Sequence, residues 1–129
     1  MSAIKEITFT HRYWVILLPL ILIGADIIAG WIQATINGTW DSTKMRKGLY
    51  RKSGELLTIL IAYAIQEAVT LPIDVTVYIS AYVIIMELLS IVENLDQAGI
   101  PVPSFVRTRL GKVAKEIDEG EEKKLYLLS

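Results

Sequence analysis

One uninterrupted apolar run constrains this chain more than any other feature. From Trp14 to Ile36 the sequence reads WVILLPLILIGADIIAGWIQATI, 23 residues with a single formal charge at Asp26. About 20 apolar residues in a helix cross the roughly 30 Å hydrocarbon core of a bilayer. A secretory signal peptide is the alternative, but the run continues past Asp26 and no A-x-A site closes it. We therefore expect a membrane-spanning helix near 14–36, in which a neighbouring group or water compensates for Pro19.

Two further apolar blocks follow. Leu56–Leu71 has only 16 residues, and a helix over 53–71 reaches 19, which spans a bilayer with some thinning. A re-entrant or interfacial helix is the alternative for this block. The block Val75–Leu95 begins with β-branched residues, but its length and its seven-residue polar spacing favour a helix. The sequence thus predicts spans near 14–36, 53–71 and 75–95.

Polar residues within each block share one helical face. Each stripe holds one acid, and no lysine or arginine lies within any block. The acids must then be protonated, hydrogen-bonded or exposed to water, because an unpaired charge in a bilayer is costly. A soluble four-helix bundle remains an alternative. The predicted stripe, facing water or neighbouring subunits, comprises Asp26, Gly30, Gln33, Asn37, Tyr63, Glu67, Ser80, Glu87, Ser90 and Asn94.

Basic residues are concentrated in two segments. The connector 37–54 holds five of the 13 lysines and arginines, and the segment after Pro103 holds six. Because basic loops stay inside, this distribution predicts an outer N-terminus and a cytoplasmic connector and C-terminus. The predicted contacts with the inner leaflet are Lys44, Arg46, Lys47, Arg51, Lys52, Arg107, Arg109, Lys112 and Lys115.

The C-terminal segment has its own pattern. Val106, Leu110, Val113 and Ile117 recur at helical spacing behind a breaker, Gly-x-Pro-x-Pro, at 99–103. Basic residues surround this face, which predicts an amphipathic helix on the inner leaflet or, equally, a docking helix for a partner subunit. We therefore divide the chain into a transmembrane domain, 1–103, and a cytoplasmic tail, 104–129.

Several functional classes are disfavoured by composition. The chain has no cysteine and one histidine, His11, so neither a thiolate metal site nor a His-rich zinc site is expected. No Gly-rich phosphate-binding loop is present. The net charge of −1 provides no polycation for nucleic acid. We expect no catalytic residue, no cofactor, no metal and no nucleic-acid partner.

Three segments resemble the toxin-secretion and phage-lysis holin family: ADIIAGWIQA, STKMRKGLYRKSGELL and MELLSIVENLDQAGIPVPSFVRTRL, together covering about 26–110. The resemblance implies a non-enzymatic protein of the host cytoplasmic membrane that oligomerises into timed lesions and releases a cell-wall hydrolase or toxin. An accessory subunit or anti-holin is the alternative, and a small transporter is disfavoured because no internal repeat is visible. The expected fold is an all-α membrane protein with about three transmembrane helices and a C-terminal amphipathic helix, forming a homo-oligomer.

Overall fold

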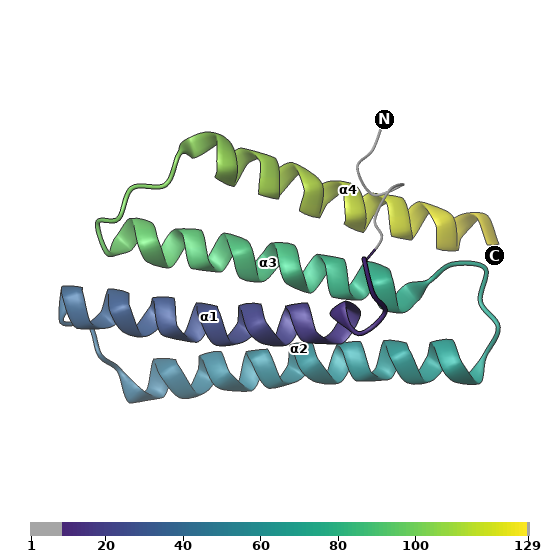
Figure 1. Ribbon diagram of the computed structural model, residues 1–129, viewed down its shortest axis with the longest axis horizontal. Helices are drawn as coiled ribbons and strands as arrows, with labels where there is room; N and C mark the ends of the chain where they lie inside the picture. The colour runs from purple at the N-terminus through teal and green to yellow at the C-terminus, as the bar shows by residue number, and fades with distance from the viewer. Residues whose placement is uncertain (1–8, 129) are drawn as a thin grey trace.

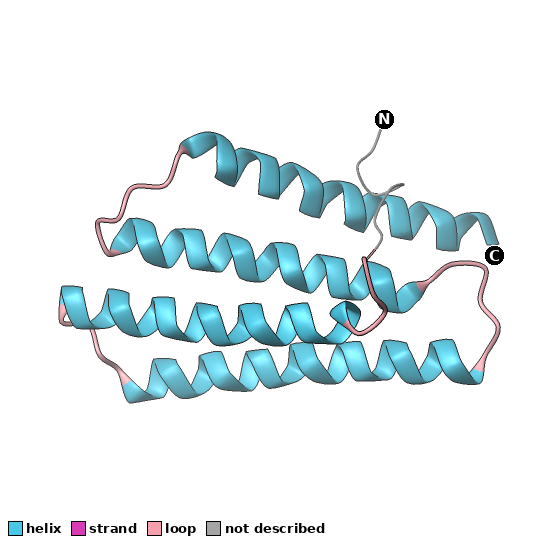
Figure 2. Cartoon of the chain, in the orientation of Figure 1, coloured by secondary structure: helices cyan, strands magenta, loops and turns pink. Residues whose placement is uncertain are grey.

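The described part of the chain has an all-α fold, as predicted. A computed structural model describes the backbone of residues 9–128 and the side chains of residues 9–119. Four helices follow one another in alternating directions (Figure 1), joined by short loops (Figure 2): α1 (Trp14–Asn37), α2 (Ser42–Ala68), α3 (Val75–Gln97) and α4 (Ser104–Leu128). Lys5, which entered the charge count above, lies outside the described residues, as do the side chains after Glu119.

The connector predicted over 37–54 is mostly helix, which corrects the expected start of the second helix. Gly38, at φ 64°, ends α1, because glycine adopts the left-handed conformation without steric cost. Asp41 then caps α2, accepting hydrogen bonds from the backbone N–H groups of Thr43 (3.0 Å) and Lys44 (3.3 Å). The helix therefore begins at Ser42 rather than at residue 53, since the capped segment is rich in good helix formers.

Side chains fix the turn between α2 and α3. The Gln66 amide donates to the carbonyl of Ile73 (3.3 Å) and accepts from the backbone N–H of Val75 (2.8 Å). Asp74 caps α3 by accepting from the backbone N–H of Val77 and also pairs with Arg12. These contacts hold the start of α3 close to the end of α2.

α3 is the central helix, in contact with all three others. One apolar cluster, Ile23, Ile59 and Val83, joins α1, α2 and α3. A second, Tyr78, Ala81 and Ile117, joins α3 to α4. Two residues of the apolar face predicted on the C-terminal segment, Val113 and Ile117, thus pack on α3 of the same chain.

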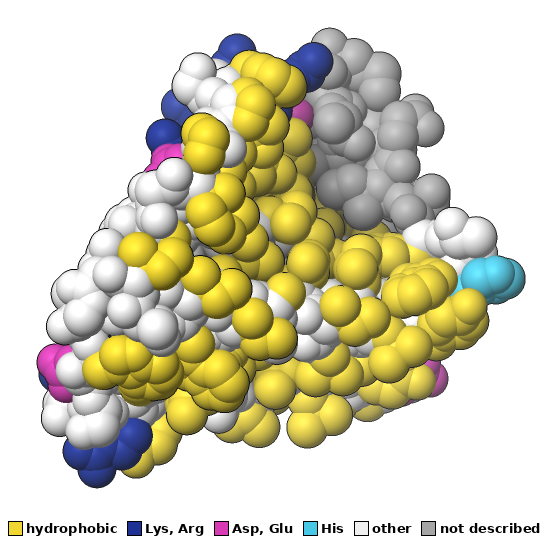
Figure 3. All heavy atoms as spheres, turned by 60° about the vertical axis from the view of Figure 1, so that its left-hand side comes forward, with side chains coloured by type: hydrophobic (Ala, Val, Ile, Leu, Met, Phe, Trp, Pro, Cys, Tyr) yellow, Lys and Arg dark blue, Asp and Glu magenta, His cyan; other side chains and the backbone are white. Residues whose placement is uncertain are grey.

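Two helices, not three, are long and apolar enough to cross a membrane within the described residues: α1 and α3. α2 is not one of them, because its first half carries the basic residues that the sequence analysis placed in the connector 37–54. The surface is nevertheless broadly apolar. Hydrophobic side chains cover much of the face in Figure 3, with lysines and arginines gathered at its margins. Exposed residues include Ile28 and Trp31 of α1 and Leu57, Leu60 and Ile61 of α2, a pattern typical of contact with lipid or with other chains.

Candidate functional site

The predicted stripes of α1 and α3 face each other inside the molecule. The Asn94 amide donates to Asp26 Oδ1 at 3.0 Å, and the Asn37 amide donates to the carbonyl of Gln97 at 2.8 Å. A Cβ atom added at Gly30 would lie 3.7 Å from Asn94 Nδ2, so the two helices approach closely there. We call this interface, with the charged groups described below, the polar seam.

Pro19 explains one contact of the polar seam. Proline has no N–H, so it leaves the carbonyl of the residue four positions earlier, Val15, without its helical donor. The hydroxyl of Ser80, fully buried on α3, donates to that carbonyl at 2.6 Å. A neighbouring helix thus compensates for Pro19, as the sequence predicted.

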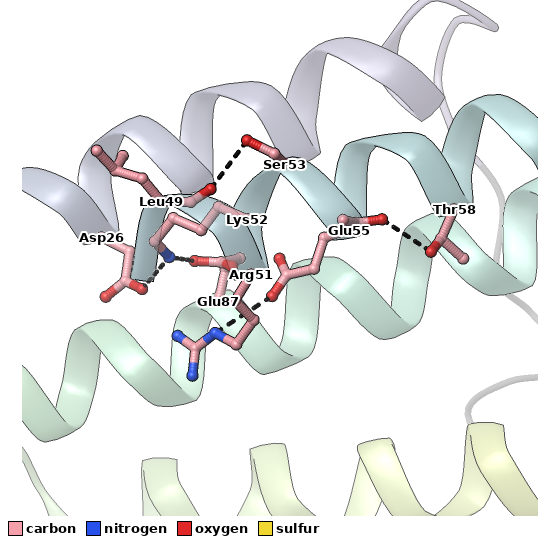
Figure 4. A network of polar contacts seen from close by, with 9 residues as sticks. Asp26, Leu49, Arg51, Lys52, Ser53, Glu55, Thr58 and Glu87 are labelled. Carbon is pink, nitrogen blue, oxygen red and sulfur yellow. Dashed lines mark hydrogen bonds and ion pairs between the residues drawn. The ribbon is translucent and has the colours of Figure 1, made fainter. Parts of the chain in front are cut away.

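A lysine joins three helices at the centre of the polar seam. Lys52 Nζ of α2 lies 2.6 Å from Asp26 Oδ2 of α1 and 2.8 Å from Glu87 Oε2 of α3. The exposed fractions of the three side chains are 8 %, 3 % and 2 %. Figure 4 shows the ammonium group between the two carboxylates. We call these three residues the charge triad.

The charge triad corrects two expectations. The acids at positions 26 and 87 do have a basic partner within the helices, and Lys52 is buried instead of contacting lipid headgroups. The sequence analysis missed this because apolar content placed the boundary of the second block just after Lys52. The detectable signal was the helical spacing of Lys52 with Leu56 and Ile59 behind the cap at Asp41.

Water-sized space reaches the charge triad from two sides. A cleft of about 290 Å³ lies among α1, α2 and α3, and its lining extends from Asp41 and Lys44 to Asp26 and Lys52. A second cleft, of about 360 Å³, lies between α2 and α3 and reaches Glu87. The buried charges therefore adjoin space that water can enter.

Comparison with known proteins decides the family. The sequence profile of the bacteriophage holin family matches residues 4–115. The chain belongs to the bacteriophage holin family. Its members are non-enzymatic membrane proteins, in agreement with the prediction that this chain is not an enzyme.

Two relatives of this holin-family chain extend the match. A probable holin of Bacillus phage phi105 is 32 % identical over 111 residues, covering 82 % of this chain and 78 % of the relative. An uncharacterised protein of Halalkalibacterium halodurans is 30 % identical over 125 residues, covering 92 % and 89 %. No solved structure shows a significant match.

The other predicted site residues of this holin-family chain are more dispersed. Gln33 contacts Thr39 at 3.5 Å, and Ser90 lines both clefts. Tyr63 and Glu67 are exposed on α2 and do not join the polar seam. Among the described residues no three potential ligands from His, Cys, Asp and Glu converge as a metal site. The remaining basic residues of the prediction are exposed, and Arg107 pairs with Asp96: Lys44, Arg46, Lys47, Arg51, Arg107, Arg109, Lys112 and Lys115.

Proposed function

We propose that this protein is a lesion-forming holin. It accumulates in the cytoplasmic membrane of a bacterial host, associates with copies of itself, and at a set time opens lesions. A cell-wall hydrolase or a toxin leaves the cell through them. Family membership and the two apolar helices support this proposal.

The position of the polar seam carries the proposal. Asp26 and Glu87 lie halfway along α1 and α3, so helices that cross a bilayer hold these carboxylates near its midplane. Ionisable groups at that depth are expensive and mark functional surfaces. Here they are enclosed within one chain, whereas large hydrophobic side chains are exposed on the outer faces of α1 and α2. A protein of this kind is compatible with lipid until its helices separate.

Chain direction supports three crossings. α1 and α3 run the same way (Figure 1), so the chain must return between them. α2 makes this return over 27 residues, or about 40 Å at 1.5 Å per residue. The basic residues of its first turns then lie at the cytoplasmic surface, where Lys44, Arg46 and Lys47 contact anionic headgroups. In this arrangement the N-terminus is outside.

The mechanism is a shift between two states. In single chains the polar groups satisfy one another, and in large assemblies the same faces line water. Rising surface concentration favours the assembled state by mass action. Expression level therefore sets the timing.

Expression in bacteria tests the proposal. We expect growth to stop and membrane potential to collapse abruptly without any phage enzyme, and lysis to follow when a cytoplasmic cell-wall hydrolase is co-expressed. The hydrolase alone is the control and leaves cells intact. Continued growth and full potential at high membrane levels of the protein would contradict the proposal.

A second candidate is an accessory subunit or anti-holin that stays small. It is favoured by the polar seam, whose side chains bond one another within a single chain and so need no second copy. Imaging of the membrane-embedded protein separates the two. Large rings or rafts favour the holin, and persistent monomers or dimers favour the accessory subunit.

A further inference from the structure

α2 is held more loosely than the other two helices of the polar seam. Only three of its 27 residues are buried, Lys52, Ile59 and Ala62, compared with six of 24 in α1 and seven of 23 in α3. It packs mainly on α3 and least on α1. The two clefts described above flank it. Of the three helices, α2 therefore has the least apolar burial to lose on moving.

Lys52 supplies the ion pairs that join α2 to α1 and α3 at this level. Glu55 of α2, which pairs with Arg51, also lies beside Glu87. Its ammonium group contacts one carboxylate on α1 and one on α3. Both clefts end at the charge triad, and Ser90 and Arg51 line both. The first cleft extends from Lys52 to Asp41 and Lys44 at the start of α2, so Lys52 can leave its partners for water along this cleft without first crossing an apolar layer.

We infer that α2 is the gating helix of the lesion and that Lys52 is its latch. At triggering α2 moves off α3, and Asp26 and Glu87 lose their shared cation. The inference rests on the proposed function, because it names the movement that regulates the same polar seam.

The consequence for the polar seam follows from charge. Two carboxylates without a cation are unstable between packed helices and draw in water from the adjoining clefts. α1 and α3 remain joined by the Ser80–Val15 and Asn94–Asp26 hydrogen bonds. When α2 leaves, water thus reaches the polar residues that α1 and α3 together present toward it.

Engineered disulfides test the movement directly. The chain has no cysteine, so an introduced pair is unique. Ile59→Cys with Val83→Cys links α2 to α3 within one apolar cluster, and Ala81→Cys with Ile117→Cys links α4 to α3 in the other. The full-length proteins are reconstituted in dye-loaded liposomes, and mass spectrometry confirms each disulfide.

We expect oxidation of the α2–α3 pair to slow dye release at least tenfold, with recovery on reduction. Oxidation of the matched α3–α4 pair leaves release within twofold. Equal release from the oxidised and reduced α2–α3 pair would overturn the gating role of α2 but not the proposed function. A tenfold block by the α3–α4 pair would overturn it as well, since the movement would not be specific to α2. Absence of release from the cysteine-free protein would overturn both proposals.

A substitution tests the latch without crosslinking. Lys52→Met removes the cation, and we expect release to begin at a protein-to-lipid ratio at least threefold lower than for the unchanged chain. Ser53→Met places the same side chain at the adjacent exposed position and leaves the threshold unchanged. A threshold for Lys52→Met that is unchanged or higher would overturn the latch.

Discussion

α3 forms two interfaces of opposite character. Toward α1 it presents Ser80 and Asn94 to polar groups of another apolar helix, and beside them Glu87 pairs with Lys52 of α2. Toward α4 it presents Tyr78 and Ala81 to the buried side chain of Ile117, and the outer face of α4 is charged. The first interface hides polar groups from an apolar surrounding, as membrane helices do. The second hides apolar groups from water, as soluble helices do.

The difference shows which solvent each interface requires. Lipid does not compete for hydrogen bonds, so polar contacts hold α1 and α3 together. An apolar contact such as that of α3 with α4 gains stability where water surrounds it and gains little where lipid does. α3 is therefore stabilised by polar contacts on its α1 side and by apolar burial on its α4 side, and substitutions on the two sides should have different effects.

The charge triad gives the largest expected effect. Lys52→Met leaves two buried carboxylates without a cation, and we expect the detergent-solubilised protein to lose about 3–5 kcal/mol of stability against unfolding. Ser53→Met, at an exposed position, should change it by less than about 0.5 kcal/mol. Denaturant titration followed by circular dichroism measures both.

A triple variant sharpens this prediction. Removing all three charges, with Lys52→Met, Asp26→Asn and Glu87→Met, should recover most of the lost stability, because no charge is left unpaired and the side-chain carbonyl at position 26 still accepts from Asn94. If the triple variant is no more stable than Lys52→Met, the loss comes from packing and not from uncompensated charge.

The α3–α4 interface gives the next effect. Ile117 is 1 % exposed, and Ile117→Ala should cost about 2–4 kcal/mol of α4 docking. Trypsin should then cleave α4 faster at Arg107, Arg109 and Lys112, while α1 and α3 stay protected. Glu119→Gln, at an exposed position, is the control. Faster cleavage throughout the chain would show that the two interfaces are not independent.

The proline contact gives the smallest effect. Ser80→Ala removes the donor to the carbonyl of Val15 and should cost about 1 kcal/mol. In the background Pro19→Ala the same change should cost much less, because the restored N–H of residue 19 bonds that carbonyl within α1. A double-mutant cycle in detergent measures the coupling. Additive losses would show that Ser80 stabilises the interface independently of Pro19.

Much of the architecture could be predicted from the sequence, since helical spacing and apolar length require little beyond local order. The stripe of Asp26 and Asn37 and that of Ser80, Glu87 and Asn94 were found in this way. That these stripes face each other depends on how the helices pack, which spacing along one helix does not encode. Likewise, an amphipathic helix such as α4 fits a membrane, a partner or its own chain equally well.

The burial of Lys52 between two carboxylates was not predicted, for another reason. Hydropathy divides a chain into apolar and charged segments, and a buried lysine at the junction is assigned to the charged one. Its partners lie 26 and 35 residues away. Long-range pairing between charges of opposite sign has no local signature apart from the helical face on which each residue lies.

The Ser80–Val15 hydrogen bond also imposes an order on biosynthesis. The ribosome delivers α1 to the membrane first, and Ser80 follows 65 residues later, which takes roughly 3–13 s at about 5–20 residues per second. During that interval the carbonyl of Val15 lacks its donor. Asp26 likewise lacks its cation until Lys52, 26 residues later, has been synthesised. Until α3 is inserted, the carbonyl of Val15 in the newly synthesised α1 therefore requires a hydrogen bond from water or from another temporary donor. α1 reaches its final set of contacts only after α3 is in place.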